Sequence, residues 1–161
     1  MKIVSNASPL IFLAKIGELD LLDKYEIKIP RQVYEEIHKG AEIGKEDTQK
    51  IESLIERKII KIEDTAIDKG IDKQNLGKGE KAAISLAINK EINIVLIDER
   101  KARRIAKFYK LKPRGTIGIL IEALKNKEID KQEFKELLRK LVKERYRINE
   151  ILILEILNKT E

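Results

Sequence analysis

Polar side chains with the chemistry of metal ligands stand at the ends of predicted strands and helices in the first hundred residues. Asp98 ends an unbroken aliphatic run, residues 94–97, which is typical of a strand buried on both faces. Asn6 follows another short predicted strand, residues 2–5. Because ligands bind at the carboxyl ends of the strands in open parallel sheets, we expect Asn6 and Asp98 to meet at one edge. Glu80, in the first turn of an Ala-rich helix, is a third candidate.

A fourth candidate, Glu36, comes from the geometry of a helix that begins near Pro30. At 100° per residue, Glu36 lies about 60° from the apolar Val33, whereas Glu35 lies about 200° away, so Glu36 is expected to point inward. Carboxylates gathered in one cleft stay ionised only beside a cation. Oxygen ligands suit Mg²⁺ or Mn²⁺, and such ions activate water and stabilise the leaving oxygen when a phosphodiester is cleaved.

A basic helix face follows directly after Asp98. Between Arg100 and Arg114 the sequence has eight basic residues and no acidic one. Arg100, Arg103 and Arg104 share one side of the predicted helix at 100–110, opposite an apolar side. Such a face either holds a nucleic-acid backbone or only keeps the surface soluble, and the sequence leaves both open.

Each candidate also has a simpler explanation. Asp98 could cap the helix that follows it, and Glu80 is favourable near a helix N-terminus through the dipole alone. Ser8 and Thr116 are ordinary N-cap residues, and the sequence predicts a helix opened by Ser8 as N-cap with Pro9 at the first helical position.

The order of predicted elements indicates an α/β fold. Strands are expected near residues 2–5, 27–29, 59–62, 94–97 and 111–113, with helices between them, and the last 45 residues are expected to be helical. Alternation of this kind predicts a central parallel sheet of four to five strands with right-handed crossovers. The helix after Pro30 is expected to end at Gly40, and residues 64–78 are expected to form a loop with a short turn.

The bulk composition narrows the class of protein. A chain of 161 residues is expected to form one domain, and its net charge of +6 is modest. The absence of Cys excludes disulfides, thiolate metal sites and Cys nucleophiles. Because we find no membrane-length apolar stretch and no signal peptide at Met1, we expect a cytoplasmic protein without a membrane partner.

Five segments together resemble the PIN domain, and more narrowly the prokaryotic PIN-like subgroup named DUF3368. They are Ile3–Ile11 (IVSNASPLI), Ile29–Ile37 (IPRQVYEEI), Gly79-Glu80, Val95–Arg100 (VLIDER) and Gly115–Leu120 (GTIGIL). Their order and approximate spacing match from residue 3 to about residue 125. Each motif alone is loose, but five in order are fairly specific.

The resemblance implies a three-layer α/β/α sandwich with a core at about 1–125 and a helical C-terminal part at about 126–161. It also implies a metal-dependent ribonuclease, with relatives that are VapC-type toxins paired with a small antitoxin and often dimeric. The family's acidic positions fall on Asn6, Glu36, Glu80 and Asp98, with Glu99 as an accessory metal ligand. Ser8 and Thr116 match hydroxyl positions near the site, and Arg100, Arg103 and Arg104 would hold the RNA backbone.

Asn6 departs from the wider PIN pattern, which has Asp at this position. An amide keeps a carbonyl ligand but removes one negative charge, which should weaken binding of a cation. Two hypotheses follow: a Mg²⁺- or Mn²⁺-dependent endoribonuclease, or a module that binds RNA or a partner protein without cleavage. A phosphoacceptor or small-ligand domain is a weaker third, because the chain lacks an acidic pair after the first strand and a Gly-rich nucleotide loop.

Overall fold

The computed structural model describes residues 1–159, with the backbone alone at 150, 152 and 159, so the end of the expected helical part, 160–161, lies outside the described residues. The strands are β1 (Lys2–Ser5), β2 (Glu26–Pro30), β3 (Ile60–Glu63), β4 (Ile94–Leu96) and β5 (Lys112–Arg114). The helices are α1 (Ala7–Lys15), the 3-10 helix η1 (Leu19–Leu22), α2 (Arg31–Glu42), α3 (Glu46–Glu56), α4 (Lys69–Asp72), α5 (Lys78–Asn89), α6 (Arg100–Phe108), α7 (Thr116–Lys125), α8 (Lys131–Lys143) and α9 (Glu150–Lys159).

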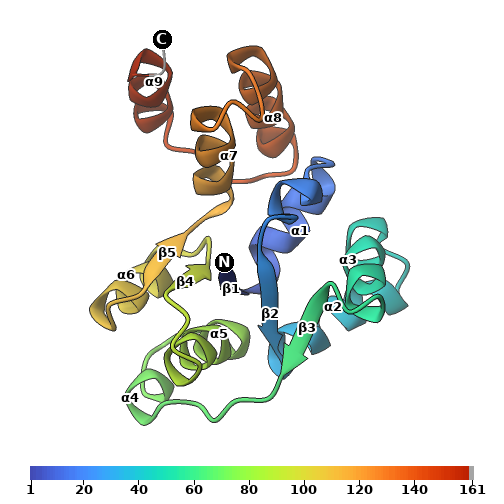
Figure 1. The fold of residues 1–161 in the computed structure, drawn as a ribbon, viewed down its shortest axis with the longest axis vertical. Coiled ribbons are helices and arrows are strands. Elements are labelled where there is room, and N and C mark those ends of the chain that lie inside the picture. The colour runs from blue at the N-terminus through green and yellow to red at the C-terminus, as the bar shows by residue number, and fades with distance from the viewer. Residues whose placement is uncertain (160–161) are drawn as a thin grey trace.

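All five strands form one parallel sheet in the order β3-β2-β1-β4-β5, as Figure 1 shows. Ile3 of β1 is in register with Ile27 of β2 on one side and with Ile94 of β4 on the other. The chain therefore moves outward from β1 through β2 to β3 and then returns to place β4 on the opposite side of β1. This reversal makes the carboxyl ends of β1 and β4 the switch point at which open α/β sheets bind ligands.

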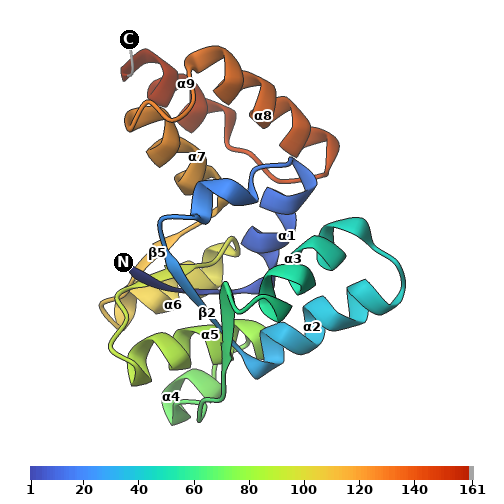
Figure 2. The same ribbon diagram turned by 45° about the vertical axis from the view of Figure 1, so that its right-hand side comes forward.

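Side chains alternate between the two faces of the sheet, and helices cover both. Ile3 and Leu96 belong to a core shared with α1, η1, α2, α3, α7 and α8, whereas Val4 and Val95 belong to a core shared with α5 and α6. The two helical layers separate in the turned view of Figure 2. The predicted three-layer α/β/α sandwich with a five-stranded parallel sheet is confirmed.

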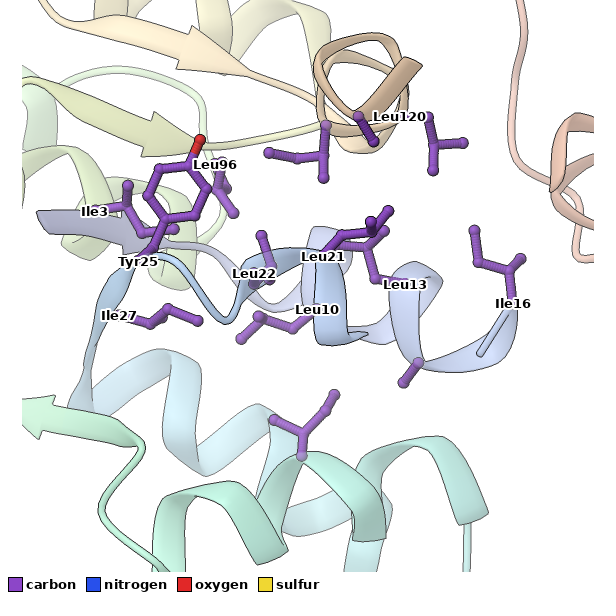
Figure 3. Close-up of a cluster of buried hydrophobic side chains, with 14 of the residues drawn as sticks. Ile3, Leu10, Leu13, Ile16, Leu21, Leu22, Tyr25, Ile27, Leu96 and Leu120 are labelled. Atoms are coloured by element: carbon purple, nitrogen blue, oxygen red, sulfur yellow. The ribbon is translucent and has the colours of Figure 1, made fainter. Parts of the chain in front are cut away.

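The larger core joins the sheet to the N-terminal and C-terminal helices. In Figure 3, Ile3, Ile27 and Leu96 from three neighbouring strands lie beside Leu10 of α1 and Leu22 of η1. Burial of aliphatic side chains on this scale fixes α1 firmly over the ends of β1 and β4. The first residues of α1 are therefore held where the candidate site was expected.

Several predicted element ends are wrong for identifiable reasons. The N-cap of α1 is Asn6 rather than Ser8, because the helix begins two residues earlier than the Ser-Pro pattern indicated. Gly40 does not end α2. A Cβ there would lie 2.7 Å from the Thr48 side chain, so this glycine allows α3 to pack closely on α2. The segment 64–78, expected to be a loop with a short turn, has its turn at the four-residue helix α4, which is capped by Asp68.

The C-terminal part forms helices as expected. Asp130 is the N-cap of α8, and its carboxylate accepts a bond from the Glu133 N–H at 2.8 Å. Over residues 1–159, none of the helices combines the length and the apolar character that crossing a bilayer requires.

Candidate functional site

Two hydrogen bonds join the chain near the ends of β1 and β4, one between main-chain groups and one between side chains. The Asn6 N–H donates to the Leu96 carbonyl at 2.9 Å, and the Ser8 hydroxyl donates to Asp98 Oδ2 at 3.1 Å. Asn6 directly follows β1, and Asp98 lies just beyond β4. The sequence therefore positions an amide and a carboxylate at the same edge of the sheet, through two strands that end beside each other.

The amide oxygen of Asn6 is buried and accepts no hydrogen bond, although Asn6 is only 7% exposed. It faces Gly79, where an added Cβ would lie 3.0 Å from Asn6 Oδ1 and 3.5 Å from Glu36 Oε2. Gly79 thus lets an amide that follows β1 and a carboxylate of α2 both come close to the start of α5. A buried polar atom without a partner is uncommon in proteins, and such atoms often belong to sites that bind an ion or a water.

Glu80 supplies a second carboxylate, close enough to Glu36 for their charges to interact. It is the third residue of α5, and its Oε1 accepts a bond from the N–H of the N-cap residue Gly77 at 2.9 Å, which is half of a capping box, because Gly77 has no side chain. Burial is the main cause that raises the pKa of Glu80. The Gly77 N–H partly opposes this, and the nearby charges of Glu99 and Glu36 raise the pKa further. Repulsion between these acids is what a cluster of carboxylates experiences when no cation is bound.

Asp98 accepts four hydrogen bonds through its two carboxylate oxygens. Oδ1 accepts from the Thr116 N–H at 2.6 Å and from the Tyr146 hydroxyl at 2.7 Å. Oδ2 accepts from the Thr116 hydroxyl at 2.8 Å and from the Ser8 hydroxyl at 3.1 Å. Ser8 and Thr116, expected near the site, thus both contact Asp98. The N-cap of α6 is Glu99, so Asp98 does not cap that helix.

Tyr146 is a site residue that the sequence reasoning missed. Burial, together with the Asp98 charge and the hydrogen bond to it, raises the pKa of Tyr146, while the Ile117 N–H and Arg103 partly oppose this. The phenol therefore stays protonated and donates to Asp98 at neutral pH. Gly115 is required beside it, because a Cβ there would lie 2.9 Å from Asp98 Oδ1 and 3.0 Å from an Arg103 nitrogen.

The basic residues of α6 separate into two kinds. Arg103 is half-buried, and its guanidinium donates to the Asp98 carbonyl oxygen at 2.7 Å, so it supports the loop after β4. Arg100 and Arg104 are exposed. Glu99 is exposed too, and its carboxylate accepts a bond from the Ala102 N–H at 2.7 Å.

Within the described part of the chain, no three His, Asp or Glu side chains are grouped closely enough to hold a metal ion by themselves. The site still fits a divalent cation in its chemistry. The unpartnered Asn6 Oδ1, the Glu36 carboxylate across Gly79 and the Glu80 carboxylate are hard oxygen donors of the kind that Mg²⁺ and Mn²⁺ prefer. All of Asp98's oxygen positions are already in use, so it could join such a set only by exchanging a hydrogen-bond donor for the cation.

The family model DUF3368, described as a PIN domain, matches residues 2–161. The chain belongs to this PIN-domain family. None of the curated proteins matches it. PIN domains are associated with nuclease activity, generally use divalent metal ions, commonly act on RNA and can pair with antitoxins. The PIN-domain match spans α7, α8 and α9 as well as the sheet, so Tyr146 lies inside the matched region.

Proposed function

We propose that this PIN domain is a Mg²⁺- or Mn²⁺-dependent endoribonuclease whose site is formed by Asn6, Glu36, Glu80 and Asp98. The observation that supports this most strongly is the buried Asn6 oxygen without a partner, facing Glu36 across Gly79 at the switch point of the sheet. A bound divalent cation would supply a more acidic water and stabilise charge on the phosphodiester. Glu99, close enough to influence Glu80, is an accessory acid in this proposal.

The remaining residues of the site would position Asp98 or bind the RNA. Ser8 and Thr116 orient the Asp98 carboxylate through their hydroxyls. Arg103 fixes the Asp98 main chain, which leaves the exposed Arg100 and Arg104 to contact RNA phosphates next to the carboxylates. Cations on the surface beside the acidic residues would attract the phosphates of the RNA backbone.

The test is cleavage of a mixed RNA substrate with Mn²⁺, comparing the native chain with Glu36→Ala, Asp98→Ala and Glu35→Ala. Glu35→Ala is the matched control, because Glu35 and Glu36 are neighbouring exposed positions of α2 and both variants remove one negative charge. We expect Glu36→Ala and Asp98→Ala to lose cleavage and Glu35→Ala to keep it. Equal cleavage by all four proteins would contradict the proposal.

A second candidate function is a module that binds RNA or a protein partner without cleavage. Asn6, in place of the usual acid, and the fully bonded Asp98 carboxylate favour it. Asn6→Asp separates the two functions, because it restores the charge that a cation would need. The binding module is supported if Asn6→Asp with Mn²⁺ cleaves no RNA while the native chain still binds RNA.

In the cell we propose that the chain acts as the toxin of a toxin–antitoxin pair, as a cytoplasmic homodimer. The family resemblance supports this role, since PIN domains can pair with antitoxins. Induced expression of the native chain should then arrest growth, and Glu36→Ala should relieve the arrest. Growth that is equal for both proteins would exclude the toxin role without excluding nuclease activity.

A further inference from the structure

Tyr146 reaches Asp98 from the segment between α8 and α9, 48 residues away in sequence. Its hydroxyl donates to Asp98 Oδ1 at 2.7 Å, beside the Thr116 N–H at 2.6 Å on the same oxygen. The helical C-terminal part thus supplies one of the four donors that fix the Asp98 carboxylate. This contact extends the site beyond the sheet and the helices that follow its strands.

The position of Tyr146 is fixed from several directions. At the end of α8 the backbone turns through Arg145, with φ at +64°, and the Tyr146 N–H donates to the Leu141 carbonyl at 2.9 Å. The Tyr146 ring packs edge-on against Phe12 of α1, with ring centroids 4.9 Å apart and an interplanar angle of 89°. Leu141 is fully buried, so this turn is anchored in the larger core. Because the phenol of Tyr146 is fixed in this way, its hydrogen bond can fix the orientation of the Asp98 carboxylate.

The two oxygens of Asp98 are held differently. Oδ1 is bound by a main-chain N–H and by the anchored Tyr146, whereas Oδ2 is bound by the hydroxyls of Thr116 and Ser8. The Ser8 bond is the longest of the four at 3.1 Å, and Ser8 lies two residues after Asn6. A serine hydroxyl rotates freely and can turn away at little cost, while a main-chain N–H cannot.

We propose that Tyr146 is a positioning residue, which ties down Oδ1 so that Asp98 presents Oδ2, on the Ser8 side, to the cation. This inference rests on the proposed function, because it assumes a divalent cation beside Asn6. Partners that hold a metal-ligating carboxylate in place are commonly worth a factor of 10 to 100 in metal affinity. Tyr146 would supply that support from the C-terminal part of the chain.

The test is calorimetric titration of the full chain with Mn²⁺, comparing native protein, Tyr146→Phe and the control Tyr25→Phe. Tyr25→Phe is a matched control, because it also removes a short hydrogen bond from a buried phenol to a carboxylate. That bond runs from the Tyr25 hydroxyl to Glu122 Oε1 at 2.6 Å and does not involve Asp98. We expect Tyr146→Phe to weaken Mn²⁺ binding about tenfold and Tyr25→Phe to leave it unchanged. Both variants should melt at slightly lower temperatures.

Three results would overturn the inference while native binding persists: unchanged Mn²⁺ affinity in Tyr146→Phe, an equal loss in both variants, or tighter binding in Tyr146→Phe. The last result would mean that Tyr146 obstructs the cation. If the native chain binds no Mn²⁺, the proposed function fails first and the inference fails with it. In RNA cleavage, a positioning role predicts a lower kcat for Tyr146→Phe with an unchanged KM.

Discussion

Gly79→Ala places a single methyl group against both Asn6 and Glu36. The new Cβ would lie 3.0 Å from Asn6 Oδ1, 3.4 Å from Val33 Cγ2 and 3.5 Å from Glu36 Oε2. Replacing Gly by Ala within a helix stabilises it by up to about 1 kcal/mol. The tight contact with Asn6 offsets much of that gain, so the stability of the metal-free protein should change by less than about 1 kcal/mol.

The effect on metal binding should be larger, because the methyl crowds both oxygens, Asn6 Oδ1 and Glu36 Oε2, that would share a cation. We expect the Kd for Mn²⁺ to rise at least about tenfold. At a Mn²⁺ concentration of about 100 times the native Kd, binding stabilises the native chain by about 2.7 kcal/mol and the variant by at most about 1.4 kcal/mol. For a chain of this size, these energies raise the melting temperature by roughly 5–11 °C and 3–6 °C.

The assay is thermal unfolding with Mn²⁺ and with EDTA, and Gly118→Ala is the control. Gly118 lies in the first turn of α7, and a Cβ there would meet only Arg114 Cβ, at an ordinary 3.6 Å. Gly118→Ala should therefore raise the melting temperature and keep the full Mn²⁺ shift. A full Mn²⁺ shift in Gly79→Ala would refute the reasoning, because the space beside Asn6 would then not be where the cation binds.

Three further predictions concern charge. Burial and the neighbouring acids raise the pKa of Glu80, so the folded protein loses stability as Glu80 ionises, and the loss is complete above the raised pKa. Glu80→Gln should therefore raise the melting temperature in EDTA at pH 7. A lower melting temperature would contradict this. Hydrogen bonds and charges from Glu52 and Glu42 raise the pKa of His38, so its stabilising contribution is complete below the unfolded pKa of about 6.5 and is lost as pH rises through the raised value. Urea unfolding of His38→Gln should thus differ more from the native chain at pH 6 than at pH 8.5. Arg104→Ala should weaken RNA binding and reduce the slope of log K against log salt by about 1, whereas Arg139→Ala on α8 should change neither.

Much of the fold and part of the site could be predicted because buried strands leave a simple pattern. The aliphatic run before Asp98 and the short strand before Asn6 end abruptly at polar residues, and parallel strands end at a common edge. These are local regularities, so a single sequence contains enough information to find them. Helical periodicity predicted that Glu36, unlike Glu35, would point inward, and this is wrong, because both side chains are exposed. Glu36 lies at the rim of the site, where its Oε2 comes close to Gly79.

The missed features depend on tertiary contacts that have no local pattern. Tyr146 lies in a polar turn between two helices, and tertiary contacts, such as the packing of its ring on Phe12 of α1, bring it to Asp98. Arg103 was expected on a basic surface that holds RNA, yet its guanidinium donates to the Asp98 carbonyl oxygen. Ser8 was expected near the site, but its partner, Asp98, could not be read from the sequence. The residue types predict that these side chains form hydrogen bonds. Their hydrogen-bond partners, however, depend on how distant segments of the chain pack together.

The central claim is that Asn6, Glu36, Glu80 and Asp98 surround one divalent cation at the ends of β1 and β4. The most direct measurement is the anomalous difference density of a crystal of this chain soaked with Mn²⁺. The account predicts a peak within about 2.0–2.4 Å of Asn6 Oδ1 and of carboxylate oxygens from the acids around it. Mn²⁺ bound elsewhere on the chain, with Asn6 Oδ1 still without a partner, would contradict it.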